Sequence, residues 1–391
     1  MKLVILASRF PYPLEKGDKL RLYYQIRDLS AQFDIYLFAL SDVRVSDADK
    51  QALQAHCSEI HVYSINGKIN LLKNAMSSRP FQVSYFYNAR IHQKITKQVS
   101  RIQPDHIYYQ LLRMYPYSFP ATAASVSIDL MDSFSVGYLL RSQQESGFLS
   151  ILYNKETQRL IAYEKKIIEE LDCKFIISEQ DKVSLVPIED NEMHIIANGI
   201  DTQFFAPEEH SKIRDILFVG NMGYKPNIYA TEFLVDKILP LLQEREQGIT
   251  LTIAGARPTS KILAYKNKHI KVTGWVEDIR DVYNTHRLFV APIFSGIGQQ
   301  NKILEAMAME IPCVVSPEVA KGLDIGNVQE YLFVAENAME FADAIIEVLA
   351  GNTDAETRVI RAKKYVLENR SWKAQNRKLS KKIMDKIHKY N

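Results

Sequence analysis

Short apolar runs alternate along the whole chain with longer stretches in which apolar residues recur every three or four positions. The short runs are rich in Val, Ile, Leu, Phe and Tyr, which is typical of strands buried on both faces. The longer stretches show the period of amphipathic helices. This alternation predicts an α/β protein in which helices cover parallel sheets.

The pattern runs through the chain twice. In the first half it predicts strands at 2–7, 33–40, 59–64, 106–110, 125–131 and 174–178, with helices between them that include 19–32 and 153–171. In the second half it predicts strands at 215–220, 250–255, 270–275, 287–292 and 312–317, with helices that include 228–243 and 301–309. Each half is therefore expected to be a doubly wound, Rossmann-like domain.

Between the two halves, residues 196–212 read IANGIDTQFFAPEEHSK and show no clear period. Asn-Gly, a proline and a run of charges are typical of a linker. The chain has 391 residues, and single cores stop growing at roughly 250–300 residues. We therefore expect domains at 1–205 and 206–370, with the boundary near Ala206, followed by a basic amphipathic helix at 371–391. Two such domains imply a cleft between facing sheet ends, because ligands bind at the carboxyl ends of parallel strands.

Composition excludes several classes of protein. A net charge of +3 argues against a dedicated nucleic-acid binder. Three separated cysteines without a CxxC pair indicate a reducing compartment and no structural zinc. The nine histidines are scattered, so no metal site is expected. The apolar start of the chain reaches Arg9 too soon for a signal peptide, and no segment is long enough to span a membrane.

Candidate chemistry concentrates in GIGQQNKILEAMAMEIPCVVSP, residues 296–317. Glycines such as Gly298 free the backbone, and the helix that follows offers unpaired amides near Gln300 and Asn301 to an anion. Lys302 lies in the first turn, where a cation opposes the helix dipole unless a phosphate is bound there. Glu305 follows three residues later on the same face and is suited to gripping a ribose diol. The alternative is a solvent-exposed Glu–Lys pair, which the apolar flanks disfavour.

Two further loops are expected to converge on the same ligand. In FVGNMGYKPN, residues 218–227, Gly220 ends a strand and Lys225 adds a positive charge before a helix; an ordinary strand–helix turn is the alternative. Gly274 ends another strand, and the backbone at Trp275 and Val276 is placed to meet a flat heterocycle. A plain packing role is the alternative for Trp275.

The stretch GQQNKILEAMAMEIPCVVSP resembles the donor-binding signature of family 4 glycosyltransferases, more narrowly that of bacterial sugar transferases of exopolysaccharide and cell-surface polysaccharide clusters. Matching segments follow the family order along nearly the whole chain: FPYPLEKGDKLR, YEKKII, NGID, FVGNMGYKPN, VTGWVEDIR and a late SW. The resemblance implies the GT-B fold, with the C-terminal helix returning to the N-terminal domain. It also implies a retaining, metal-independent hexosyltransferase without a cofactor, which moves a sugar from a nucleotide sugar to a glycan or lipid-linked acceptor.

The resemblance also assigns roles to residues. Glu305 would bind the ribose, and Lys302 with Gln300 and Asn301 would bind the diphosphate. The backbone of Trp275 and Val276 would contact the base. From the N-terminal domain, Gly17 would lie near the donor sugar, and the flanking Asp18 and Lys19 would touch that sugar or the acceptor. The donor-side candidates are Gly17, Lys19, Gly220, Asn221, Lys225, Trp275, Val276, Gly298, Gln300, Asn301, Lys302 and Glu305.

The sequence departs from the family pattern in four places. Ile297 stands where many relatives hold the donor sugar with a glutamate, and Asn221 stands where many have an arginine. Glu310 replaces the usual helix-ending glycine. Asp132 stands near the place of a family histidine and is expected to hold an acceptor hydroxyl, to accept a proton, or to cap the next helix. Arg113 and Asp18 complete the catalytic candidates, whereas Asp129 is interpreted as buried structure.

A basic, aromatic-rich segment runs from Lys68 to Arg113. It suits a lipid-linked acceptor at an anionic membrane face, and a solvated helix face over a Tyr-rich core is the alternative. The basic C-terminal helix could join that surface. We expect a cytoplasmic protein, peripheral at the inner face of the cytoplasmic membrane. Two rival functions remain: a non-catalytic accessory subunit of a glycosyltransferase complex, and a sugar-nucleotide epimerase.

Overall fold

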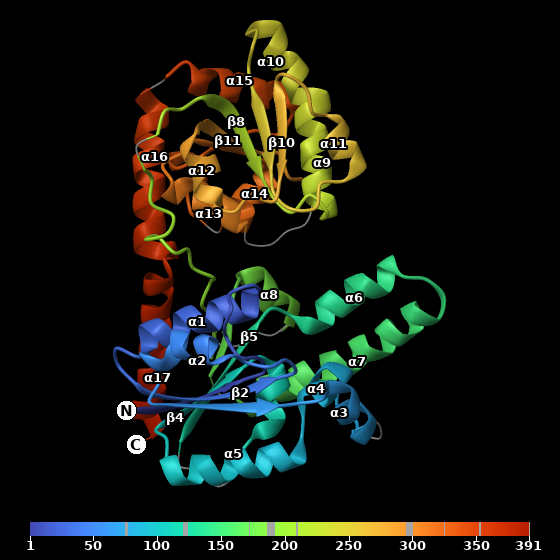
Figure 1. Ribbon diagram of the computed structural model, residues 1–391, viewed down its shortest axis with the longest axis vertical. Helices are drawn as coiled ribbons and strands as arrows, with labels where there is room; N and C mark the ends of the chain where they lie inside the picture. The colour runs from blue at the N-terminus through green and yellow to red at the C-terminus, as the bar shows by residue number, and fades with distance from the viewer. Residues whose placement is uncertain are drawn as a thin grey trace. The chain divides into compact units, whose positions relative to one another are not determined.

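The computed structural model describes residues 1–74, 77–119, 124–171, 173–185, 192–208, 210–294, 300–323, 325–351 and 353–390 (Figure 1). The chain divides into two compact units. The N-terminal unit comprises Met1–Gly199 and Trp372–Asn391, and the C-terminal unit comprises Ile200–Ser371. The division falls at Gly199 rather than near Ala206. Ile200 pairs with Ser371 and is buried in the core of the C-terminal unit, so the linker region is already part of that unit.

The N-terminal unit contains one parallel sheet of seven strands in the order β3-β2-β1-β4-β5-β6-β7. Its strands are β1 (Lys2–Ala7), β2 (Asp34–Ser41), β3 (Glu59–Ser64), β4 (His106–Gln110), β5 (Ser125–Met131), β6 (Lys174–Ile176) and β7 (Met193–Ile195). The first six lie where the apolar runs predict strands. β7 was not expected, because its three residues are too few to show a pattern.

The helices of this unit are α1 (Gly17–Leu29), α2 (Asp47–Gln54), α3 (Gly67–Lys73), α4 (Phe81–Phe86), α5 (Ala89–Ile102), α6 (Phe134–Gln144), α7 (Gly147–Glu170), α8 (Glu179–Leu185), α17 (Trp372–Tyr390) and the 3-10 helix η1 (Leu112–Tyr117). α17 returns from the far end of the sequence, as the resemblance implies. Leu379, Ile383 and Ile387 enter a core that also contains residues of β1, β2 and α1. The Trp372 ring stacks on Tyr24 of α1 at 5.1 Å.

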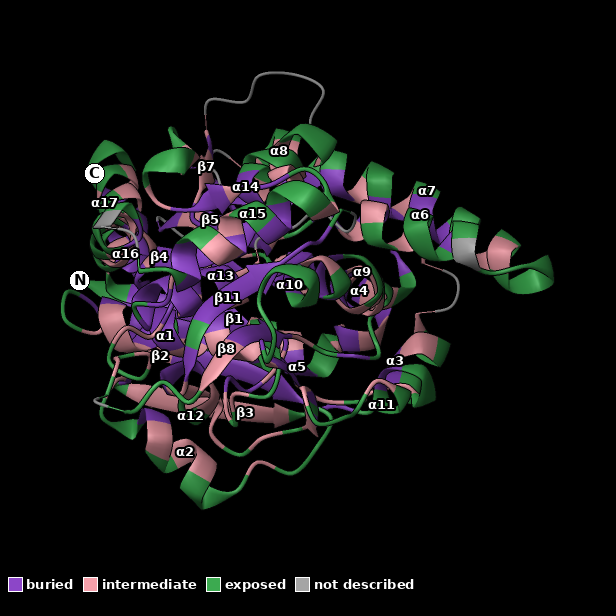
Figure 2. Cartoon of the chain, turned by 90° about the horizontal axis from the view of Figure 1, so that it is seen from above, coloured by how far each residue is buried: buried purple, intermediate pink, exposed green. Residues whose placement is uncertain are grey.

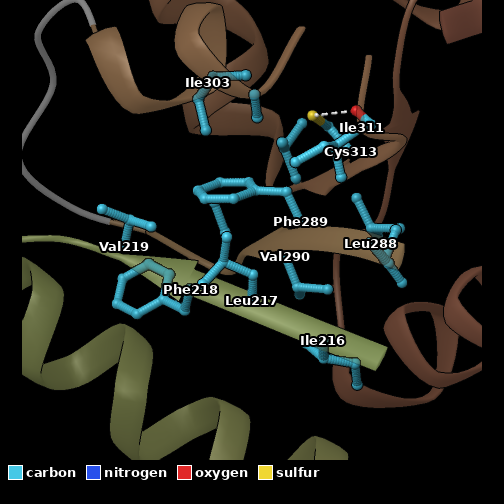
Figure 3. Packing of buried hydrophobic residues seen from close by; sticks show 14 of the residues in the cluster. Ile216, Leu217, Phe218, Val219, Leu288, Phe289, Val290, Ile303, Ile311 and Cys313 are labelled. Carbon is cyan, nitrogen blue, oxygen red and sulfur yellow. Dashed lines mark hydrogen bonds between the residues drawn. The ribbon is translucent and has the colours of Figure 1, made fainter. Parts of the chain in front are cut away.

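The C-terminal unit repeats the architecture with six parallel strands in the order β10-β9-β8-β11-β12-β13. Its strands are β8 (Arg214–Val219), β9 (Leu251–Ala254), β10 (Ile270–Gly274), β11 (His286–Ala291), β12 (Cys313–Val315) and β13 (Phe333–Val334). Apolar residues of β8 and β11 pack with Ile303 of α13 in the middle of this core (Figure 3). The two-residue β13 was not expected from the sequence.

Its helices are α9 (Lys225–Phe233), α10 (Leu239–Arg245), α11 (Ser260–Ala264), α12 (Ile279–Asn284), α13 (Asn301–Ala308), α14 (Pro317–Gly322), α15 (Ala338–Leu349) and α16 (Thr353–Tyr365), with the short elements η2 (Leu234–Ile238), η3 (Val328–Glu330) and η4 (Val366–Arg370). The helix expected at 228–243 is interrupted by the π-turn η2. Pro240 follows directly and cannot donate a helical hydrogen bond, so the wider turn accommodates it. In both units the central strands are buried, the edge strand β3 is only partly buried, and the outer helix faces are exposed (Figure 2).

The basic segment near residues 68–113 is mostly a solvated helix face over an aromatic core. Ile91, Ile95 and Val99 of α5 are buried, whereas the cations of this helix point outward: Arg90, Lys94, Lys97 and Arg101. The aromatic residues Phe86, Tyr108 and Tyr109 lie in the interior. Within the part of the chain that the structure describes, every helix is too short or too polar to cross a lipid bilayer.

Glu310 has the left-handed conformation that a glycine would favour. Its φ is 54°, directly after α13, and its carboxylate forms an ion pair with Lys363. A left-handed non-glycine residue costs on the order of 1 kcal/mol. A partly exposed ion pair returns less than about 1 kcal/mol. The glutamate is therefore a small net cost to the stability of the C-terminal unit.

Glu310→Gly should be more stable than Glu310→Ala by about 1 kcal/mol. Both variants lose the ion pair with Lys363, but only the alanine variant retains the strained backbone. Chemical denaturation followed by circular dichroism measures the difference. Equal stability of the two variants would show that the left-handed backbone costs nothing here.

Candidate active site

The sheet order of the C-terminal unit places a crevice at the carboxyl ends of β8 and β11. These strands are neighbours, and the chain leaves them toward opposite edges of the sheet. Such a switch point is where open α/β sheets bind ligands. Gly220 and Asn221 follow β8, and α13 follows β11. The segment 295–299, which includes Gly298 and Ile297, lies outside the described residues.

Lys302 in the first turn of α13 is held over the end of β8. Its Nζ donates a hydrogen bond of 2.6 Å to Oδ1 of Asn227 and lies 5.0 Å from the centre of the Phe218 ring. Burial lowers the pKa of Lys302 to about 8, although the Glu305 carboxylate opposes this shift. An ammonium that has lost much of its hydration is well prepared to bind an anion.

Asn227 is fixed on its other side by the loop that follows β8. Its Nδ2 donates to the carbonyl oxygen of Asn221 at 3.0 Å. A Cβ at Gly220 would lie 2.7 Å from this Nδ2, and a Cβ at Gly255 would lie 1.9 Å from the Gly220 oxygen. Gly255 also has a φ of +134°. Both glycines are therefore required by the packing of the protein itself, whatever ligand approaches.

Glu305, one turn further along α13, is oriented by a buried tyrosine. The Tyr283 hydroxyl donates to Oε2 of Glu305 at 2.9 Å and also lies 3.3 Å from the Lys302 carbonyl oxygen. Burial raises the pKa of Glu305, while the tyrosine and Lys302 lower it. The carboxylate is only partly buried, so it keeps capacity to accept further hydrogen bonds.

Gln300 occupies the N-cap position of α13 without a side-chain cap, and Asn301 begins the helix. The Oδ1 of Asn301 is a buried acceptor with no hydrogen-bond partner among the described residues. An orphaned buried acceptor is costly, which favours a ligand or water that donates to it. This polar atom lies beside the helix amides that the sequence assigns to anion binding.

The remaining candidates of this unit lie at the surface. Asn221 accepts a hydrogen bond of 3.0 Å from the amide of Gly223, and Lys225 is exposed at the start of α9. Trp275 follows β10 and is 71% exposed, so it is not a core residue. Val276 beside it is half-buried. The exposed indole removes the packing alternative and leaves this loop open to a ligand.

In the N-terminal unit, the candidates gather at the corresponding switch point between β1 and β4. Asp18 in the first turn of α1 accepts from Nη1 of Arg9 at 2.6 Å, and its carbonyl accepts from Gln110 at 2.8 Å. Lys19 donates to the Tyr12 carbonyl at 3.2 Å. A Cβ at Gly17 would meet nothing within 4 Å, so open space surrounds this glycine.

Arg113 lies on η1, just after β4. Its guanidinium is 4.9 Å from the Phe86 ring centre and 5.0 Å from that of Phe134, and Nη2 donates to Gln82 at 2.8 Å. Burial lowers its pKa to about 10. Nε and Nη1 are buried with no hydrogen-bond partner among the described residues. These enclosed donors show that much of Arg113 serves packing.

Asp132 and Asp129 have different environments at the end of β5. Asp132 is exposed, and the side chain of Ser133, not Asp132, caps α6 by accepting from the amide of Val136. Capping therefore does not explain Asp132. Asp129 is fully buried, and its Oδ2 accepts from three donors at 2.7–2.9 Å: Arg21, Gln25 and Tyr108. This carboxylate is structural.

The sequence did not single out Asn227, Tyr283 or Phe218 as parts of the site. Asn227 directly follows Pro226 in the first turn of α9, a position where a polar side chain faces the strand ends. That placement was the one available signal. Among the described residues, no group of three or more His, Cys, Asp or Glu side chains is arranged to hold a metal ion.

Lys302 should react with an amine-acylating reagent with a midpoint near pH 8, well below the ~10.4 of a lysine in a peptide. Asn227→Asp places a carboxylate against the ammonium and should raise this midpoint. Competitive labelling followed by mass spectrometry of the peptide containing Lys302 measures both. A midpoint near 10 in the wild-type protein would contradict the desolvated environment.

Comparison with known proteins agrees with this geometry. Residues 213–351 match the family model of glycosyl transferases group 1. An uncharacterized 44.6 kDa protein in the cps region of Klebsiella pneumoniae is 22% identical over 407 residues, covering 100% of both chains. Putative glycosyltransferase EpsF of Bacillus subtilis is 26% identical over 155 residues, or 36% of this chain and 40% of EpsF.

Solved structures share the whole fold. Anabaena Alr3699/HepE, in complex with UDP, superposes with a TM-score of 0.67 at 12% identity and covers 98% of this chain and 100% of that one. The same Anabaena protein has been solved with UDP-glucose. Two doubly wound sheets, a returning C-terminal helix and the matched sugar-transfer domain lead to one conclusion. The chain has the GT-B fold of solved glycosyltransferases, and its residues 213–351 match the group 1 glycosyl transferases.

Proposed function

We propose that this glycosyltransferase takes a nucleoside-diphosphate sugar as its donor and holds it on α13. The observation that carries the proposal is the preset pair of Lys302 and Glu305, fixed by Asn227 and Tyr283 at the switch point of the C-terminal unit. The ammonium and the helix amides near Gln300 and Asn301 bind the diphosphate. The carboxylate binds the ribose.

The two charges suit two chemically different parts of one ligand. A diphosphate only accepts hydrogen bonds and carries negative charge, so it pairs with Lys302. A ribose diol donates two hydrogen bonds, so it satisfies the carboxylate of Glu305. The spacing of three residues on a helix puts these groups on one face. The exposed loop at Trp275 and Val276 contacts the base, and Lys225 and Asn221 add polar contacts near the phosphates.

The transfer proceeds with retention at the anomeric carbon and without a metal ion. In this chemistry a donor phosphate oxygen accepts the acceptor's proton on the same face, so no dedicated protein base is required. Lys302 and the helix amides stabilise the charge that develops on the departing diphosphate. Gly17, Asp18 and Lys19 contact the sugar or the acceptor. Asp132 and Arg113 are the acceptor-side candidates.

The acceptor is a glycan or lipid-linked glycan of surface polysaccharide or glycoconjugate synthesis, handled in the cytoplasm at the inner face of the membrane. The similarity to a protein of a cps region and to EpsF supports this setting. The Anabaena complexes with UDP and UDP-glucose support a nucleotide-sugar donor. Ile297 replaces a sugar-binding carboxylate of many relatives, so the proposal does not specify the identity of the donor sugar.

A panel of nucleotide sugars tests the proposal with the full-length protein. One donor should raise the melting temperature and be hydrolysed slowly when no acceptor is present. Release of an epimerised nucleotide sugar would favour the epimerase instead. Absence of binding by any nucleotide would overturn the proposed function and leave the accessory subunit as the better account.

Glu305→Ala should weaken binding of the active nucleotide by roughly 2 kcal/mol or more, because it removes charge-assisted hydrogen bonds to the ribose. Isothermal titration against the ribonucleotide and its 2′-deoxy analogue separates this role from misfolding. The wild-type protein should prefer the ribonucleotide, whereas the variant should bind both equally. A preference that survives in Glu305→Ala would remove the ribose assignment.

Donor affinity should fall as the pH rises above about 8, because the pKa of Lys302 in the free protein is about 8 and only the charged ammonium pairs with the diphosphate. The bound diphosphate raises that pKa, so the dissociation constant should grow by up to about tenfold per pH unit. A nucleotide sugar is the suitable probe because its phosphates do not titrate in this range. Lys302→Arg, which stays charged, should give a flat profile; a slope equal to that of the wild type would contradict the assignment.

A further inference from the structure

A helical hairpin with an apolar tip projects from the N-terminal unit. α6 and the first half of α7 run side by side away from the sheet (Figure 1). Large apolar side chains around the turn are exposed: Leu139, Leu140, Phe148, Leu149 and Ile151. Phe148 is 77% exposed and Ile151 is 66% exposed. These two lie three residues apart on α7 and therefore share a face.

The hairpin is internally well held, so this exposure is not explained by loose packing. The rings of Tyr138 and Tyr153 meet edge to face at 5.7 Å, and the Ser150 hydroxyl donates to the Ser142 carbonyl at 2.8 Å. A rigid element that presents several large apolar side chains to solvent marks an interaction surface.

A second group of exposed apolar side chains lies on α3. Leu72 is 79% exposed and Ile69 is exposed beside it. α3 packs on α4, and α4 is joined to α7 because the Phe81 amide donates to Glu156 and the Arg159 guanidinium lies 5.1 Å from the Phe81 ring centre. The exposed apolar side chains of the α6–α7 hairpin and of α3 therefore belong to one continuous side of the N-terminal unit.

The chain segment that contains α3 carries only positive charges, although Asp42 lies nearby and accepts a hydrogen bond from Tyr85. Residues 65–104 contain seven Lys or Arg and no Asp or Glu. On α3, Lys68 and Lys73 flank the exposed Leu72. Exposed apolar side chains beside an excess of cations complement a bilayer with anionic headgroups, since the cations attract the surface and the apolar side chains enter it. The same cations would repel a second copy of this face.

We propose that the tip of the α6–α7 hairpin and α3 dock the N-terminal unit on an anionic lipid bilayer, with Phe148, Ile151 and Leu72 entering the acyl boundary. The inference rests on the proposed use of a lipid-linked acceptor and assigns the membrane contact to specific residues. It narrows the contact expected for the segment from Lys68 to Arg113 to α3 and adds the hairpin. Anionic headgroups provide the partner, and no other protein is required.

Flotation of the full-length protein with vesicles tests the proposal. The wild-type protein should bind vesicles of phosphatidylcholine and phosphatidylglycerol and bind pure phosphatidylcholine weakly. Phe148→Ser with Ile151→Ser should lower the partition coefficient at least about tenfold on the mixed vesicles, because two large apolar side chains no longer enter the bilayer. Lys68→Glu with Lys73→Glu should lower it at least about fivefold per charge, and this loss should shrink at high salt.

A matched control comes from the C-terminal unit, where Ile213 is 71% exposed and Ile360 is 69% exposed. Ile213→Ser with Ile360→Ser removes the same kind of side chain and should leave vesicle binding unchanged. A second readout is Phe148→Trp, whose fluorescence should be quenched by brominated lipid, in contrast to Ile360→Trp. The melting temperature and circular dichroism spectrum of every variant verify that both units are folded, and nucleotide affinity verifies the donor site.

Three results would overturn the inference. Wild-type protein that fails to bind the mixed vesicles, or a hairpin variant that binds as the wild type does, excludes the hairpin as the membrane contact. A dimer by light scattering that the hairpin variant converts to a monomer, without vesicle binding, assigns the tip to a second copy. If nucleotide binding is intact in these experiments, the proposed donor function stands although the membrane inference fails. If the wild-type protein binds no nucleotide, the donor function is contradicted and the membrane inference is judged by vesicle binding alone.

Discussion

The hydrogen bond from Lys302 to Asn227 joins the two strand ends on which the site depends. Lys302 comes from the helix after β11, and Asn227 comes from the helix after β8, so one 2.6 Å contact fixes both sides of the switch point. Asn227 can hold this position only because Gly220 leaves room for its amide, and Gly220 in turn abuts Gly255. Close contacts at the ends of β9, β8 and β11 thus fix the position of the Lys302 ammonium group. The neutral partner matters, because an amide oxygen orients the lysine without cancelling its charge.

The N-terminal unit repeats the topology but distributes its polar groups differently. Its strongest carboxylate contact, from Asp129 to Arg21, is buried and receives two further donors, so it stabilises α1 against β5 and has no capacity left for a substrate. Such a pair is costly to break, because removing one partner leaves a buried charge. Near the strand ends, Arg9 with Asp18 and the partly enclosed Arg113 are already paired or packed, whereas Asp132 is exposed. A ligand of Arg9, Asp18 or Arg113 must therefore replace an existing partner, whereas Lys302 and Glu305 of the C-terminal unit are oriented in advance and keep hydrogen-bonding capacity.

Much of the fold can be predicted from the sequence, because parallel strands that are buried on both faces appear as continuous apolar runs. The runs at 106–110 and 125–131 coincide with β4 and β5. The pair at Lys302 and Glu305 could be found because helical spacing alone puts the two side chains on one face. Asn227 and Tyr283 could not, since they lie 75 and 22 residues from their partners and meet them only after the sheet forms.

The aromatics near Phe86 and Tyr109 were equally ambiguous, because sequence spacing does not distinguish a tyrosine in a core from one at a surface. The hairpin tip was missed for the same reason: its apolar residues resemble the buried face of any helix.

The shifted pKa values of Lys302 and Glu305 explain why a site of this kind discriminates among ligands. Burial disfavours the charged form of both groups, lowering the pKa of the lysine and raising that of the glutamate. Their mutual attraction recovers part of this cost but not all of it. A ligand with an anionic part and a diol part stabilises each charge with the complementary chemistry, whereas a simple anion helps the lysine and repels the glutamate. Selectivity for a nucleotide over free phosphate then follows from the position of Glu305 one helical turn after Lys302. The Glu305 carboxylate accepts hydrogen bonds from the ribose of a nucleotide, but it repels a phosphate that has no ribose.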